Sequence, residues 1–170
     1  MTGDIKIATI LPYKENYTFS KAQAAAIWVS DFFTNSKFKK SNFIFGNTSK
    51  KDYLTNNYIN ITLESIKSKF LSTTNEYCKE FIKINNKMKF DIIEIHNRPL
   101  VLSYLQKKIS SKFIIYFHND PLSMKGSITR NERINLLNIS DKIVFISEWV
   151  KKRFFKNIED YSDQKTKVIY

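Results

Sequence analysis

Two nine-residue stretches of the chain follow one pattern: IIEIHNRPL at residues 92–100 and IIYFHNDPL at residues 114–122. Each contains two isoleucines, a variable residue, an apolar residue and then His-Asn-x-Pro-Leu. The two histidines are 22 positions apart in the sequence. Because that spacing fits one strand, one short helix and two loops, we expect two successive strands of one sheet. Each strand would end at its histidine and be stopped by the following proline.

Further apolar runs alternate with helical patterns along the chain. Runs that suit strands buried on both faces occur at residues 5–11, 43–45, 58–61, 91–95, 113–117, 142–146 and 168–170. This alternation predicts the α/β class: a Rossmann-like parallel sheet flanked by helices. With no linker or low-complexity tract, we expect one domain over residues 1–170.

Capping boxes and apolar spacing predict the helices between these strands. A Ser or Thr followed three residues later by Glu or Gln occurs at Ser20–Gln23, Thr73–Glu76 and Thr129–Glu132. The first helix would bury Ala22, Ala25, Ala26, Val29 and Phe32, and the second Tyr77, Phe81, Ile84 and Met88. A late helix is expected from Trp149 to Phe155.

Composition excludes several classes of protein. A hydrophobic fraction of 42% with 15% aromatic residues excludes a disordered tail. No apolar run approaches the roughly 20 residues that cross a bilayer, and the polar first residues predict no signal peptide. The single cysteine, Cys78, excludes an internal disulfide and a cysteine-based zinc site. Its helical context predicts a buried, inert thiol and favours a reducing cytoplasm.

The net charge of +12 allows a nucleic acid, an anionic membrane surface or a phosphate-bearing ligand as partner. The lysines are scattered, and the abundance of Asn, Ile, Lys and Phe also arises from AT-rich coding. Compositional bias and a role at a membrane surface are therefore equally supported. Nucleic acid ranks lower, because no basic and aromatic motif of the sheet-reading type is present.

The two histidines are the main candidates for chemistry. In a parallel sheet both would emerge at the carboxyl-terminal edge, where open α/β sheets bind ligands. Imidazole takes a proton from a hydroxyl or donates to an oxygen, so His118 with Asp120 is a candidate catalytic pair. Candidate acceptor-binding residues beside them are His96, Asn97, Arg98 and Asn119.

Two loops at the same edge supply further candidates. Lys125 lies in a loop that runs into the helix predicted at Thr129, an arrangement that can cradle an anion; an ordinary capped surface loop is an equal alternative. Tyr13 and Lys14 follow the first strand. The basic residues Lys151, Lys152, Arg153 and Lys156 are interpreted as a solvated helix face.

One segment carries a resemblance to a known family. The run KIVFISEWVKKRF at residues 142–154 resembles the segment of strand, Ser-Glu and basic helix in the N-terminal domain of family 4 (group 1) retaining glycosyltransferases, which have the GT-B fold. The strand that ends at His118 is similar to the one where that family carries a histidine near the reacting sugar. Residues 167–170 resemble the strand that leads into the interdomain linker, so the resemblance covers nearly the whole chain.

The resemblance implies a function. Such enzymes bind the acceptor with this domain and the nucleotide-sugar with a second one, and they transfer the sugar without an obligatory metal or other cofactor. The parent enzyme would act in the cytoplasm, peripheral to the inner face of an anionic membrane. It would transfer a sugar to a glycan or lipid-linked acceptor in cell-envelope polysaccharide synthesis.

The chain departs from the family pattern in two places. Residues 12–16 replace the Gly-rich loop that touches the donor phosphates, a role that would pass to Lys14 and Tyr13. The second domain is absent, so we expect this chain alone to be inactive.

The sequence leaves one other function open and argues against a second. A basic α/β module that docks on an anionic membrane or nucleic acid would show steep salt dependence and no need for the His-Asn-x-Pro loops. A flavodoxin-like or receiver-like domain would require an acidic cluster or a phosphate-binding loop after the first strand. Residues 12–16 supply neither.

Overall fold

The computed structural model describes residues 5–49, 51–63, 72–159 and 163–170. Within these residues seven strands form one sheet in the order β3-β2-β1-β4-β5-β6-β7. The strand pairs β1–β2, β2–β3, β5–β6 and β6–β7 are all parallel. The predicted α/β class, a Rossmann-like parallel sheet flanked by helices, is confirmed.

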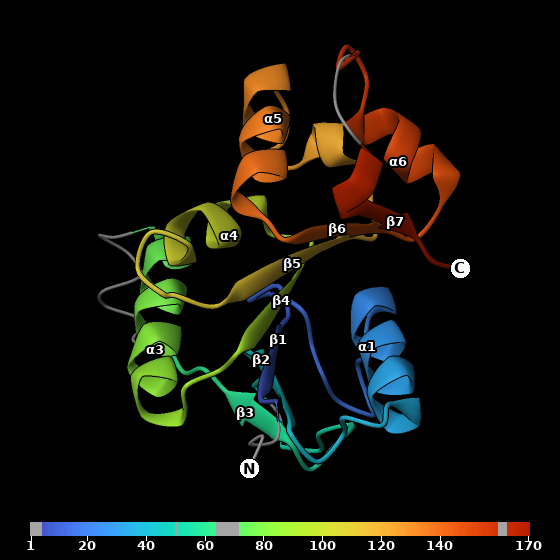
Figure 1. Ribbon diagram of the computed structural model, residues 1–170. Coiled ribbons are helices and arrows are strands. Elements are labelled where there is room, and N and C mark those ends of the chain that lie inside the picture. Colours follow the sequence, from blue (N-terminus) through green and yellow to red (C-terminus); the bar gives the residue numbers. More distant parts are fainter. Residues whose placement is uncertain (1–4, 50, 64–71, 160–162) are drawn as a thin grey trace. The chain divides into compact units, whose positions relative to one another are not determined.

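The chain divides into two compact units, residues 1–93 and 94–170. Strand β4 (Ile92–His96) begins in the first unit and ends in the second. The first unit otherwise contains β1 (Ile7–Ile10), α1 (Ala24–Asn35), β2 (Asn42–Gly46), β3 (Tyr58–Asn60) and α3 (Thr73–Met88). Within it, α1 and α3 lie on opposite sides of the strands (Figure 1).

The start of α1 differs from the prediction. The helix begins at Ala24 and no side chain caps it at Gln23, so the capping box predicted at Ser20 is wrong. A carboxylate from the loop after β1 acts instead: Glu15 Oε1 accepts a hydrogen bond from the N–H of Ala26 at 3.1 Å. Glu15 is buried, and its negative charge faces the positive end of the helix dipole. A long-range contact therefore replaces the local cap.

The helix packs its apolar face on an aromatic core. Val29 and Phe33 are buried, whereas Phe32, which was expected inside, is 49% exposed. Beneath α1, the rings of Tyr17 and Tyr58 stack with centroids 5.1 Å apart. This packing secures α1 against β2 and β3.

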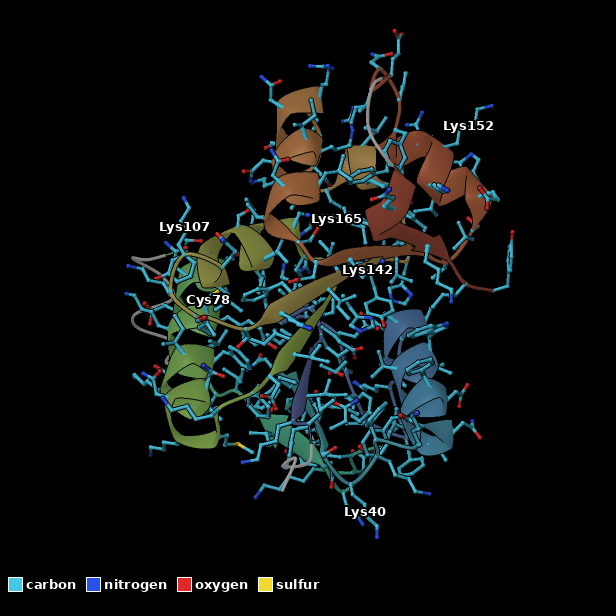
Figure 2. The ribbon with its side chains drawn as sticks, viewed as in Figure 1. Lys40, Cys78, Lys107, Lys142, Lys152 and Lys165 are labelled. Carbon is cyan, nitrogen blue, oxygen red and sulfur yellow. The ribbon has the colours of Figure 1, made fainter. Side chains whose placement is uncertain are left out.

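Helix α3 begins at Thr73 itself, after Ser72, so Thr73 does not cap it and the capping box predicted with Glu76 is wrong. Tyr77 and Phe81 are buried as expected. Cys78 is also fully buried on this helix (Figure 2). Burial raises the pKa of its thiol to about 12, which confirms the predicted inert thiol.

In the second unit, each strand before the last is followed by a helix. Its elements are α4 (Pro99–Leu105), β5 (Lys112–Phe117), the 3₁₀ turn η1 (Pro121–Ser123), α5 (Arg130–Ile139), β6 (Lys142–Phe145), α6 (Glu148–Phe154), the 3₁₀ turn η2 (Asp163–Lys165) and β7 (Thr166–Val168). Helices α5 and α6 lie on the same side of β6 (Figure 1). Phe117 of β5, Phe145 of β6 and Phe154 of α6 pack their rings together.

Both ends of α5 are capped. The predicted capping box is confirmed: Thr129 Oγ1 accepts from the N–H of Glu132, whose carboxylate accepts from the N–H of Thr129. At the other end, Lys165 Nζ donates to the carbonyls of Leu137 and Ser140, both at 3.0 Å (Figure 2). A cation at the carboxyl end and a carboxylate at the amino end both match the helix dipole. Within the described residues, no helix combines the length and apolarity that crossing a membrane requires.

Replacing Glu15 with Ala should lower the free energy of unfolding by about 1–2 kcal/mol, because the buried N–H of Ala26 loses its acceptor. Chemical denaturation of both proteins measures the difference. Glu80→Ala is the matched control, since Glu80 pairs with Lys83 on the surface of α3 and its loss should cost less than about 0.5 kcal/mol. Equal effects of the two changes would contradict this account of the α1 cap.

Candidate active site

The two histidines of the chain meet at the ends of adjacent strands. His96 is the last residue of β4, and His118 directly follows β5. The Nδ1 atom of His96 lies 2.8 Å from Nε2 of His118, and the rings stack with centroids 5.1 Å apart. At this distance one nitrogen donates its proton to the other. The geometry predicted from the repeated motif is therefore present.

Two more side chains complete the cluster from the same strands. The Tyr116 ring stacks on His96 at 4.5 Å, with an angle of 6° between the ring planes. Its hydroxyl donates to Glu94 Oε1 at 3.1 Å. Sequence reasoning missed Tyr116 and Glu94, although a signal was available: residues two apart on a strand face the same side, so each stands beside a histidine.

Burial keeps both histidines neutral. His96 is 1% exposed. Its burial, and to a lesser extent the electrostatic effect of His118, holds its pKa well below 6.5. Burial also lowers the pKa of His118 to about 4. Neither ring is therefore near its pKa at neutral pH. The pair is suited to donating and accepting hydrogen bonds as neutral imidazoles rather than to carrying a positive charge.

Asn97 ties the ends of the two strands together. Its backbone is in the left-handed region, at φ 52°, which Asn adopts more readily than most residues. Its N–H donates to the carbonyl of Tyr116 at 2.9 Å, and its Oδ1 accepts from the N–H of His118 at 2.7 Å. Asn97 is buried, whereas Asn119, at the same place in the second motif, is exposed. The two asparagines therefore have different surroundings.

Asp120 makes contacts that hold its loop in place. Its Oδ1 accepts from the N–H of Leu122 at 3.0 Å, which caps η1. Its Oδ2 accepts from Arg153 at 2.8 Å (Nη2) and 3.1 Å (Nε). The bond from Arg153, foremost, holds the pKa of Asp120 below its ordinary value. Arg153 was interpreted as solvated, and nothing local in the sequence predicts a partner 33 residues away.

The loop after η1 is fixed against its surroundings. Gly126 has φ +93°, and a Cβ there would lie 3.0 Å from Leu100 Cδ2. Only glycine suits this close approach to α4. The buried Arg133 donates to the carbonyls of Ser127, Ile128 and Lys156. One guanidinium thus joins the loop to the residues that follow α6.

The remaining predicted residues lie in varied settings. Arg98 is the residue before α4 and is half-buried, and Lys125 is exposed. The start of α5 already carries the Glu132 carboxylate, which disfavours an anion there. Lys125 as a binding residue stays a prediction.

Tyr13 and Lys14 belong to the first unit. The Tyr13 ring lies 6.2 Å from that of Tyr77 on α3, and Lys14 is exposed. Their contact with donor phosphates stays a prediction. In the part of the chain that the structure describes, no three His, Cys, Asp or Glu side chains gather in a way that could hold a metal ion.

The fold recurs in solved structures. No protein-family model matches the sequence, and no curated protein does either. The arrangement of strands and helices is the Rossmann-like one found in GT-B glycosyltransferases. At the sequence identities involved, this likeness shows the fold alone.

The individual matches cover almost all of this chain. Sucrose-phosphate synthase from Thermosynechococcus elongatus superposes with a TM-score of 0.65 and 12% identity, over 97% of this chain and 47% of that one. A shorter structure of the same synthase superposes with a TM-score of 0.65 and 10% identity, over 96% of this chain and 87% of that one. HepE from Anabaena, solved in complex with UDP, superposes with a TM-score of 0.61 and 12% identity, over 98% of this chain and 44% of that one. The chain thus spans about half the length of the longer synthase chain and of HepE.

Replacing Asn97 with Ala should destabilise the chain by about 2 kcal/mol, because the His118 N–H loses its acceptor and the left-handed backbone becomes strained. Asn97→Gly should relieve the backbone strain but not restore the lost hydrogen bond, so it should recover only part of the lost stability. The control is Asn119→Ala, which is expected to change the unfolding free energy by less than about 0.5 kcal/mol. Equal denaturation midpoints for Asn97→Ala and Asn119→Ala would refute the role of Asn97.

Acid should destabilise the protein through His118. Its folded pKa of about 4 lies below the unfolded value of 6.5, so the unfolded chain binds the proton more tightly. The contribution of neutral His118 to the free energy of unfolding is complete above pH 6.5 and is lost as the pH falls towards 4. Between pH 7.5 and 5 we expect a loss of about 2 kcal/mol from this group. The measurement is denaturation at each pH; a His118→Gln variant with the same pH dependence would contradict the assignment.

Proposed function

We propose that this chain is the N-terminal, acceptor-side domain of a family 4 retaining glycosyltransferase with the GT-B fold. The observation that carries the proposal is the His96–His118 pair, 2.8 Å apart at the carboxyl ends of two adjacent strands. That edge is where open α/β sheets bind their ligands. The fold shared with a sucrose-phosphate synthase supports the same reaction class.

In this proposal His118 is the group that contacts the reacting sugar. It is less buried than His96, and its pKa of about 4 leaves it neutral at physiological pH. A neutral imidazole hydrogen-bonds a hydroxyl in a site where an added positive charge would be costly to bury. The hydrogen bond to His96 and the bond from its backbone to Asn97 fix the direction of the ring.

The neighbouring residues have supporting roles. Asp120, which the sequence suggested as a catalytic partner, would position the loop through Arg153 and Leu122. His96 and Asn97 are buried and would orient His118 from behind. Arg98, Asn119 and Lys125 are more exposed than His96 and Asn97, and they would contact the acceptor.

The donor would be a nucleotide-sugar held mainly by a further domain of the parent protein. HepE, which has a similar fold, was solved in complex with UDP, and this chain spans 44% of it. Lys14 and Tyr13 would reach the donor phosphates. We propose transfer without a metal or other cofactor, to a glycan or lipid-linked acceptor of cell-envelope polysaccharide, at the cytoplasmic face of the membrane. The chain alone would not turn over.

The test is transfer of a labelled sugar from a panel of nucleotide-sugars by the protein made from the complete reading frame. His118→Ala should lower the rate at least about 100-fold if the imidazole acts in the transition state. Lys107→Ala, at an exposed lysine after α4, is the control and should leave the rate unchanged. Circular dichroism checks that both variants are folded.

Two outcomes would contradict the proposal. An unchanged rate in His118→Ala removes this residue from the mechanism. If no nucleotide-sugar is used and the protein instead binds anionic vesicles with steep salt dependence, the chain is the basic binding module that its charge of +12 also allows.

A further inference from the structure

One face of α6 combines an exposed aromatic ring with positive charges. Trp149, Lys152 and Arg153 lie on α6 at the spacing of a single helical face, and Lys156 comes two residues after the helix ends. Trp149 is 58% exposed, and Lys152 and Lys156 are exposed. These four residues and Phe155 line a concavity in the surface. Lys152 is marked beside α6 in Figure 2. We refer to these five residues as the Trp149 face.

The indole of this face has a fixed neighbour. The guanidinium carbon of Arg153 lies 5.8 Å from the centre of the Trp149 ring, in cation–π contact. The same guanidinium is bonded twice to Asp120. The carboxylate therefore holds a planar group next to the indole, and the ring is supported in its exposed position.

The position of Lys156 is also determined. Its carbonyl accepts from Arg133 at 2.7 Å, and Arg133 is itself buried and bonded to the carbonyls of Ser127 and Ile128. The end of the Trp149 face is thus fastened to the loop after η1. That loop begins at Met124, six residues after His118, so the face and the candidate active site lie in one continuous part of the second unit.

The charges of the face favour an anion. The charge of Arg153 is balanced by Asp120, while Lys152 and Lys156, four residues apart in the sequence, carry ammonium groups at the surface. Glu148, the one carboxylate of α6, lies at its first turn. A phosphate or carboxylate between the two lysines would meet two cations, each a compact point charge with three donors.

The exposed indole adds a second requirement. An apolar ring surface in water is stabilised when another apolar surface covers it. A pyranose ring has such a surface, because axial C–H groups cover its faces while its equatorial hydroxyls point outward from its edge. Of the large apolar side chains in α6, which the structure describes throughout, Trp149 alone is exposed. One indole in a concavity suits a ring better than it suits a lipid surface.

We propose that the Trp149 face binds an anionic saccharide, with the sugar ring on Trp149 and its phosphate or carboxylate between Lys152 and Lys156. This inference rests on the proposed function, since it names the chemical class of the acceptor: a glycan that carries an acidic group. Binding at the face is nevertheless a property of this chain and can be measured without transfer.

Fluorescence of Trp149 gives a direct readout. The chain has two tryptophans, so Trp28→Phe leaves Trp149 as the single indole. Trp28 stacks on Phe32 in α1 and contributes nothing to the face. Glucose 6-phosphate and glucuronate are the probes; each should change the emission of Trp149 in a saturable way. Glucose and inorganic phosphate, tested separately, should bind at least about tenfold more weakly, since each supplies only half of the contacts.

The double change Lys152→Ala with Lys156→Ala should weaken binding of glucose 6-phosphate about tenfold or more. The matched control is Lys107→Ala with Lys108→Ala, which removes two exposed lysines from the same unit and should leave binding unchanged. Trp149→Ala, followed through amide chemical shifts of α6, should abolish binding of the sugar ring.

The other outcomes overturn either this proposal or the proposed function, and they can be told apart. If neither probe saturates, or if both double variants weaken binding equally, the face is not a saccharide site. If vesicles of equimolar phosphatidylcholine and phosphatidylglycerol shift the emission of Trp149 while both probes fail, the face docks on a membrane. Saccharide binding without transfer by the complete protein would contradict the proposed function alone. Transfer without binding at Trp149 would place the acceptor elsewhere.

Discussion

Asn97 provides the constraint on which the candidate site depends. Its left-handed backbone turns the chain at the end of β4, and its N–H and side-chain oxygen both bond to the end of β5. Together with the pairing of β4 and β5, these two bonds bring His96 and His118 close to each other. Because a buried donor or acceptor must find a partner, the turn and the strand pairing depend on each other. The site is therefore a consequence of how two strands end.

Burial then determines what that geometry can do. Two imidazoles in contact, one of them covered by Tyr116, cannot both gain protons without placing charge in a poorly solvated place. The structure consequently separates two kinds of polar group. The histidines are neutral and buried or half-buried, while the charged pair of Asp120 and Arg153 lies nearer the solvent. Recognition by hydrogen bonds and anchoring by charge are carried out by different residues.

The sequence predicted those features that depend on neighbours in the chain. The strand ends followed from the repeated His-Asn-x-Pro-Leu pattern, and the cap at Thr129 from its own Glu132. The caps proposed at Ser20 and Thr73 were wrong: α1 begins at Ala24, where Glu15 bonds to the N–H of Ala26, and α3 begins at Thr73 itself. The pair of Asp120 and Arg153 spans 33 residues and has no local signature. Tyr116 and Glu94 both occupy the variable position of the motif, two residues before a histidine. Because residues two apart on a strand face the same side, their pairing beside the histidines could have been predicted.

The single thiol has a practical consequence for experiments on this chain. With its pKa near 12 and its side chain enclosed under α3, Cys78 is almost entirely protonated and out of reach of alkylating reagents while the first unit is folded. A cysteine introduced on the surface can therefore be labelled selectively with the native residue left in place. In the same preparation, the slow rate at which Cys78 is labelled measures the opening of the first unit, because only molecules in which α3 has separated from the sheet can react.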